Sequence, residues 1–193
     1  MKDRIFFPLA LLLLVGMVLL AIWPAFGRLP DGSVTGDGVN YDRITIEGAF
    51  LNKVVAGGDA TTELVRDRDG DYLLFIEAQA GMLGPEPEEG PHFQLASDLE
   101  VQFSGKRIRS TVRMRPADQG GAMQAKLIYS VGRDGDSGWQ TFDLEQEFQD
   151  FSFEYIVPDH MGDQAYDYFA IRPVVPDKSR ALLVESIVFE RLD

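Results

Sequence analysis

The chain has 193 residues and a formal net charge of −13. Its first 28 residues carry Lys2, Arg4 and Arg28 against Asp3, a net charge of +2, which leaves −15 for the remainder. Such an acidic domain repels phosphate groups, which disfavours nucleic-acid partners, and the same charge keeps a protein soluble. The sequence contains no cysteine, which excludes disulfides, thiolate metal sites and a cysteine nucleophile.

Residues 5–26 form an uncharged stretch that is rich in leucine. As a helix with a rise of 1.5 Å per residue, this stretch reaches about 33 Å, enough for a bilayer core of roughly 30 Å. Trp23 and Phe26 stand near its outer end, where aromatic rings favour the headgroup region, and Pro24 marks the expected end of the helix. We predict that Ile5 to Phe26 is a transmembrane signal anchor in contact with the lipid bilayer.

A cleaved signal peptide is the alternative for this segment, and Ala25, Phe26 and Gly27 resemble a cleavage site. The apolar stretch, however, is longer than the roughly 7–15 residues that are usual for a signal peptide, so the sequence favours an uncleaved anchor. Basic residues near the N-terminus keep that end in the cytoplasm. The sequence therefore predicts a cytoplasmic tail of residues 1–4, a single pass through the bacterial cytoplasmic (inner) membrane, and an exported periplasmic part.

The exported part begins with residues 27–40, which are rich in glycine, aspartate and serine and are predicted to be a flexible linker. Residues 41–193 then contain short apolar or alternating segments separated by turn signals, which is typical of a β-sandwich or jelly roll. No sustained helical period follows the anchor. The ten predicted strands are Arg43–Phe50, Thr61–Val65, Tyr72–Gln79, Phe93–Phe103, Arg107–Arg115, Met123–Val131, Gln140–Leu144, Phe148–Val157, Tyr168–Val175 and Leu182–Arg191.

Two of these segments reveal their faces by alternation, because successive side chains of a strand point to opposite sides. In 148–157, the aromatic residues Phe151, Phe153 and Tyr155 share one predicted core side. In 107–115, Ile108, Val112 and Met114 take the core side, and the other side carries four arginines at 107, 109, 113 and 115. These arginines either pair with acidic neighbours across the sheet or line a binding surface.

From about Gly90 to the C-terminus, the chain resembles bacterial jelly-roll domains of the carbohydrate-binding, galactose-binding-like type. The segments that carry the resemblance are 105–115, Tyr129, 137–142, 151–158, 167–173 and 184–189. The resemblance implies an all-β jelly-roll β-sandwich, here preceded by one N-terminal transmembrane α-helix. It also implies binding of a glycan on a face or on loops, or contacts with proteins. Such domains often hold a structural calcium ion near the chain ends, and Glu47, Asp59 and Glu190 are the weak candidates for its ligands.

Several strings of residues suggest catalysis or metal binding, but local chemistry favours turns. Residues 135–138, Gly-Asp-Ser-Gly, resemble a serine-protease nucleophile segment, yet Trp139 follows and His92 does not stand in the family's histidine pattern. Residues 67–71 resemble the start of an EF-hand loop, but the later ligand positions are wrong, so an Asp-Gly turn is favoured. The acidic segment 85–89 lacks the environment that a glycosidase acid needs. Neither His92 nor His160 has a second ligand at zinc spacing.

The remaining candidate is a shallow sugar site, since sugars stack on exposed rings while charged or amide side chains fix their hydroxyls. Tyr168 and Arg172 share a predicted strand face, and Trp139 follows a turn. These residues, with Arg113 and Arg115, form the candidate ligand-binding set. The alternative, in which the aromatic rings pack in the core and the arginines make surface ion pairs, is slightly favoured because exposed strand faces commonly carry mixed charges.

The sequence therefore predicts a membrane-anchored, non-catalytic periplasmic binding module that recognises a glycan, and it predicts no enzyme. The alternative is a single-span accessory or structural subunit of a larger membrane protein complex, in which the sandwich contacts partner subunits on the periplasmic side. The apolar segment 9–20 has only Ala10 and Gly16 as small residues, so it lacks a tight helix-packing motif, which weakens this alternative.

Overall fold

The structure is a computed structural model that describes residues 3–22, 28–81, 83–159 and 166–193. The chain divides into two compact units, Met1–Pro30 and Asp31–Asp193. The first unit contains one helix, α1 (Asp3–Ile22). In the part of the chain that is described, no helix is sufficiently long and apolar to cross a membrane. Residues 23–26, which end the predicted anchor, lie outside the described residues.

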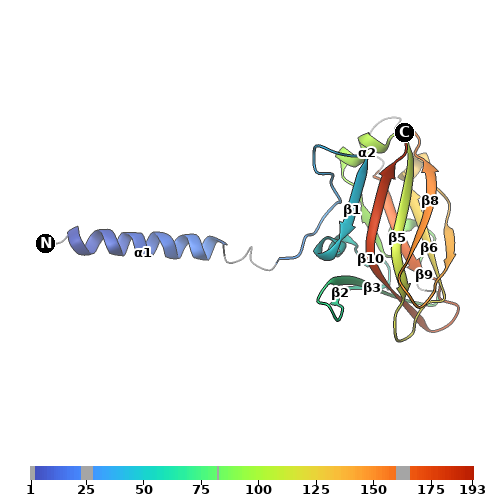
Figure 1. The fold of residues 1–193 in the computed structure, drawn as a ribbon, viewed down its shortest axis with the longest axis horizontal. Coiled ribbons are helices and arrows are strands. Elements are labelled where there is room, and N and C mark those ends of the chain that lie inside the picture. The colour runs from blue at the N-terminus through green and yellow to red at the C-terminus, as the bar shows by residue number, and fades with distance from the viewer. Residues whose placement is uncertain (1–2, 23–27, 82, 160–165) are drawn as a thin grey trace. The chain divides into compact units, whose positions relative to one another are not determined.

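The second unit contains two antiparallel sheets, of six and four strands (Figure 1). The larger sheet has the order β2-β3-β10-β5-β8, and β1 pairs with β10 beyond the end of β3. This arrangement is allowed by the length of β10, which spans thirteen residues. The strands of this sheet are β1 (Arg43–Glu47), β2 (Thr61–Arg66), β3 (Tyr72–Gln79), β5 (Arg107–Pro116), β8 (Gln149–Ile156) and β10 (Ser179–Arg191).

The smaller sheet has the order β4-β9-β6-β7. Its strands are β4 (His92–Gln94), β6 (Gln124–Ser130), β7 (Gln140–Asp143) and β9 (Tyr168–Pro173). Helical turns occupy some of the connections between strands, namely η2 (Gly48–Lys53), η3 (Pro87–Glu89), α2 (Ser97–Phe103) and η4 (Gly132–Asp134). The two sheets pack face to face, so each has an inner face in the core and an outer face.

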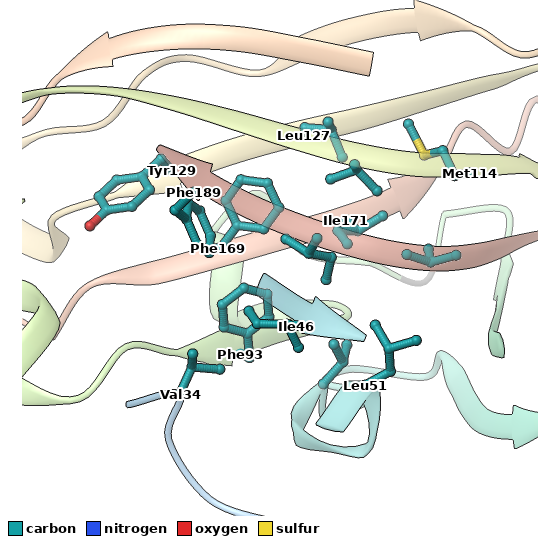
Figure 2. Close-up of a cluster of buried hydrophobic side chains, with 14 of the residues drawn as sticks. Val34, Ile46, Leu51, Phe93, Met114, Leu127, Tyr129, Phe169, Ile171 and Phe189 are labelled. Carbon is teal, nitrogen blue, oxygen red and sulfur yellow. The ribbon is translucent and has the colours of Figure 1, made fainter. Parts of the chain in front are cut away.

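Aromatic side chains from both sheets fill the centre of the core (Figure 2). The ring of Phe189 on β10 lies 5.1 Å from that of Phe169 on β9, between centroids, and 5.9 Å from that of Phe93 on β4. Phe103 and Tyr129 also contact Phe189, each at 6.1 Å. All five side chains are almost completely buried. Burial of large aromatic side chains on this scale is the main force that holds the two sheets together.

A bulge in β10 keeps its apolar side chains on the inner face. The register of β10 against β5 shifts between Val184 and Ser186. Because of this extra residue, both Val184 and Ile187 point into the core although three positions separate them. Glu185, at the bulge, is left on the outer face, where it pairs with Arg113.

The predicted strand Phe93–Phe103 is wrong, because the segment divides into strand β4 and helix α2. Leu99 and Phe103, four residues apart, are both fully buried on one side of α2. A helix of seven residues makes only two turns, which is too short to display a sustained helical period. Each of the other nine predicted segments overlaps one strand of the structure.

Residues 33–36, which lie within the predicted flexible linker 27–40, pack on the sandwich. Val34 is 3% exposed and belongs to the core cluster. Its backbone N–H donates to the Gln94 carbonyl at 2.8 Å, and its carbonyl accepts from Ala96 at 2.8 Å. The Gly36 N–H donates to the carboxylate of Asp98 at 2.9 Å. One apolar residue with paired backbone groups thus fixes part of a segment whose composition is typical of linkers.

Candidate functional site

The arginines of β5 lie on the outer face of the six-stranded sheet, and Arg109 and Arg113 pair with carboxylates of neighbouring strands. Arg109 donates to Glu154 at 2.8 Å. Arg113 pairs with Asp150 at 3.3 Å and with Glu185. These contacts match the interpretation of the arginine face as a set of cross-strand ion pairs. Exposed pairs of this kind contribute little to stability, because water and salt screen the charges.

Arg115, the second β5 candidate for ligand binding, is also engaged. Its guanidinium lies 2.7 Å from Asp118 and 5.1 Å from the ring centroid of Phe148. The hydrogen bond from Arg115, with its positive charge, lowers the pKa of the Asp118 carboxyl. The structure therefore places Arg113 and Arg115 on the outer face of the six-stranded sheet. It does not bring them together with the other three candidates, because Tyr168 and Arg172 belong to the four-stranded sheet and Trp139 immediately precedes its strand β7.

Trp139 and Arg172 meet on the outer face of the four-stranded sheet. Phe169 and Ile171 of β9 point into the core, so Arg172 points outward. Its guanidinium carbon lies 4.6 Å from the centroid of the Trp139 ring, in a cation–π contact. Trp139, which immediately precedes β7, is half-buried there, so the expectation that it packs in the core is not met.

Arg172 fastens a loop to this sheet. Only 8% exposed, it donates from Nη1 to the Gly84 carbonyl at 2.6 Å and from Nη2 to the carbonyls of Glu86 and Pro87. Burial lowers the pKa of Arg172, while nearby glutamates act in the opposite direction. A Cβ atom at Gly90 would lie 2.6 Å from Arg172 Nε, so this close approach requires glycine. Arg172 thus positions the loop and the indole, and both of its terminal nitrogens are occupied by backbone carbonyls.

A hollow of about 520 Å³ opens beside Trp139. Lys126 of β6 is exposed on the same face, because its neighbours Ala125 and Leu127 point into the core. In the sheet register, Lys126 lies opposite Arg172 on one side and Thr141 on the other. The side chains that line the hollow include Trp139, Lys126, Gln79, Leu83, Val174 and Val175. An aromatic ring, aliphatic side chains and a few polar groups form the typical lining of a site for a small organic ligand.

Tyr168 shares the outer face with Arg172 but does not line the hollow. Its ring makes an edge-on contact with His92 at 5.6 Å between centroids. Burial, and secondly the charge of Glu88, raise the pKa of Tyr168. The ring of His92 is fixed by a contact of 2.7 Å between Nδ1 and the Gly90 carbonyl. His160 lies outside the described residues.

The three candidate calcium ligands do not converge. Glu190 pairs with Arg43 at one end of β1, while Glu47 stands at the other end of that strand. Asp59 lies in the turn before β2. Within residues 3–22, 28–81, 83–159 and 166–193, no group of three or more acidic or histidine side chains could hold a metal ion.

The two motif-like strings are turns. Asp67 Oδ1 accepts the backbone N–H of Asp69 at 2.9 Å and that of Asp71 at 2.8 Å, which closes the turn between β2 and β3. Ser137 Oγ accepts the Tyr129 N–H at 3.0 Å and donates to the Gly138 carbonyl at 3.1 Å. The aspartate and the serine thus bond to backbone groups, as the turn interpretation predicts.

No protein-family model matches the chain, and no curated protein matches it. Among solved structures, the CBM22-1 xylan-binding domain of Xyn10C from Paenibacillus barcinonensis is 11% identical, with a TM-score of 0.52 over 78% of this chain and 94% of that one. The tandem CBM22-1–CBM22-2 domains of the same protein give 12% and 0.50, over 72% of this chain and 41% of theirs. An arabinose-bound α-L-arabinofuranosidase, MgGH51, gives 10% and 0.55, over 83% of this chain and 29% of that enzyme.

The domain has the jelly-roll sandwich fold of carbohydrate-binding modules. The resemblance noted in the sequence is therefore confirmed for the fold. The chain spans 41% of the tandem modules and 29% of the arabinofuranosidase, so these matches concern a single domain of longer proteins. At identities of 10–12%, the likeness concerns the arrangement of strands and not the side chains of a site.

Proposed function

We propose that this protein is a non-catalytic module that binds a glycan at the hollow beside Trp139. The observation that carries the proposal is the indole ring held against the Arg172 guanidinium at 4.6 Å, at the edge of a hollow of about 520 Å³. A sugar ring presents an apolar C–H face that packs on such an indole, while its hydroxyls need polar partners at the rim. Gln79 and Lys126 supply these partners here.

The preformed geometry supports recognition without movement. Arg172 reaches the carbonyls of the 84–87 loop and packs on the indole, so the loop and Trp139 are held in place before a ligand arrives. A preorganised ring reduces the entropy that binding would otherwise cost. The fold adds support, since one protein with the same arrangement of strands is a xylan-binding domain.

The lining of the hollow favours binding over hydrolysis. Glycoside hydrolysis uses two carboxyl groups on either side of the scissile bond. Among the described residues, the side chains that line the hollow include neither aspartate nor glutamate. We therefore assign this face a binding role.

We further propose that residues 5–26 tether the module to the cytoplasmic membrane, with the sandwich on the periplasmic side. Support comes from the 22 uncharged residues and from Lys2 and Arg4 before them. The tether is tested by expressing the full chain in a bacterium and extracting its membranes with alkaline carbonate. Retention in the pellet, with digestion of the domain by protease added to spheroplasts, is the expected result. Release into the supernatant would contradict the tether.

Glycan binding is tested with the full chain in mild detergent on an array of neutral and acidic oligosaccharides. We expect one glycan class to bind, and Trp139→Ala to abolish that binding. Phe50→Ala is the matched control, because Phe50 is an aromatic residue that is 56% exposed and does not line the hollow. An array without any bound glycan, or equal binding by both variants, would refute the proposal.

A further inference from the structure

Lys126 is a solvent-exposed cation that lines the hollow. It makes no hydrogen bond or ion pair with any residue that the structure describes. The arginines on the opposite sheet behave differently, since Arg109, Arg113 and Arg115 each pair with at least one carboxylate. The chain has 31 acidic and 18 basic residues, so it contains more than enough carboxylates to pair with every cation.

The surroundings of Lys126 contain little that could neutralise it. The second cation of the hollow, Arg172, has its terminal nitrogens bonded to loop carbonyls. Glu86, Glu88 and Glu89 lie near Arg172, but none of them lines the hollow. An ammonium group only donates hydrogen bonds. A partner that offers only acceptors, and carries a negative charge, therefore complements Lys126 better than a hydroxyl does.

The strand register sets the distance between the ammonium and the ring. Lys126 lies opposite Thr141, and Trp139 precedes Thr141 by two residues, so Lys126 and Trp139 are diagonal neighbours. Diagonal neighbours across a strand pair are about 7–8 Å apart. A sugar ring stacked on Trp139 thus places an exocyclic substituent within reach of the flexible lysine side chain.

From this arrangement we infer that the hollow selects an acidic glycan, in which a uronate carboxylate pairs with Lys126 while its sugar ring stacks on Trp139. The inference rests on the proposed glycan binding and specifies the substrate class of that same site. A uronate gives the Lys126 ammonium a partner of opposite charge, which a neutral sugar does not offer.

The test uses matched polysaccharide pairs that differ only in the carboxyl group. Each uronate polymer, namely polygalacturonate, β-1,4-glucuronan, β-1,4-mannuronan and glucuronoxylan, is compared with its carboxyl-reduced form. Binding is followed by fluorescence of the full chain in detergent, in a Trp23→Phe background. Trp23 and Trp139 are the two tryptophans, so Trp139 alone then reports.

We expect one acidic polymer to bind at least about fivefold more tightly than its reduced form, the ratio that 1 kcal/mol of ion-pair energy gives. Lys126→Met should remove this preference, Lys126→Arg should keep it, and added salt should weaken it. Equal or tighter binding of a reduced form, or an unchanged preference in Lys126→Met, would overturn the inference while glycan binding stands. If no polymer binds and the array is also empty, the proposed function itself fails.

Discussion

The substitution Arg172→Met tests whether one side chain fastens the 84–90 loop to the four-stranded sheet. Methionine keeps much of the aliphatic volume of arginine but removes every donor. The carbonyls of Gly84, Glu86 and Pro87 then lose their bonds to the guanidinium, and the Trp139 ring loses its cation. The loop should loosen, and the indole should move with it.

The expected cost follows from these contacts. Hydrogen bonds to a charged group contribute about 1.5–3 kcal/mol each, and a cation–π contact about 0.5–2 kcal/mol. The cost of burying the guanidinium offsets part of these contributions, because an arginine that is 8% exposed has lost most of its hydration. We expect a net loss of roughly 3 kcal/mol in the free energy of unfolding. For a domain of about 160 residues, this lowers the melting temperature by about 6–12 °C.

The assay is thermal unfolding of the full chain in detergent, together with hydrogen exchange of the amides in 84–90. Arg107→Met is the matched control, because the Arg107 side chain is 51% exposed and lies 3.9 Å from its partner Glu154. The control should melt close to the parent and leave exchange of the loop unchanged. The reasoning would be refuted if both variants melted alike, or if Arg172→Met left exchange of the loop amides unchanged.

Four further predictions concern stability. Burial, and then the charge of Asp167, hold the pKa of Tyr129 well above its ordinary value of 10. The contribution of the protonated Tyr129 to the free energy of unfolding is therefore complete below pH 10 and is lost as pH rises further. In denaturant titrations, Tyr129→Phe should lose less stability at alkaline pH than the parent protein. Phe189→Ala should cost about 3–5 kcal/mol by calorimetry, and a cost below 1 kcal/mol would contradict its central place in the core. Val34→Ala should cost about 1–2 kcal/mol if residues 31–40 belong to the domain, whereas a free linker predicts no change in denaturant midpoint. Gly57→Ala should lower expression and melting temperature, because φ is +56° and a Cβ atom would lie 2.2 Å from the Gly90 carbonyl oxygen; an unchanged melting curve would contradict that contact.

Much of the sandwich could be predicted from local patterns. Alternation in 107–115 correctly assigned Ile108, Val112 and Met114 to the core and the arginines to the surface. The bulge in β10 could not be predicted, because the phase of its apolar residues depends on pairing with β5, more than seventy positions away. Helix α2 was missed for a different reason, since two turns give too few positions to distinguish a helical period from an alternating one.

The candidate site was predicted only in part, because its members come from different strands. Trp139 and Arg172 were singled out, yet their contact depends on the order β9-β6-β7, which no local pattern encodes. Arg113 carried the same chemistry but lies on the other sheet. The sequence indicates that Lys126 faces outward, since it alternates with apolar neighbours that are buried. Only the register of β6 with β7 and β9, however, places Lys126 at the hollow.

Acrylamide quenching of Trp139 fluorescence tests the central claim most directly. The Trp23→Phe full chain in detergent is measured with and without a saturating amount of the glycan that binds best on the array. A sugar stacked on the indole excludes the quencher, so the account predicts a clear fall in the quenching constant. A glycan that binds but leaves quenching of Trp139 unchanged would place its site elsewhere and contradict the account.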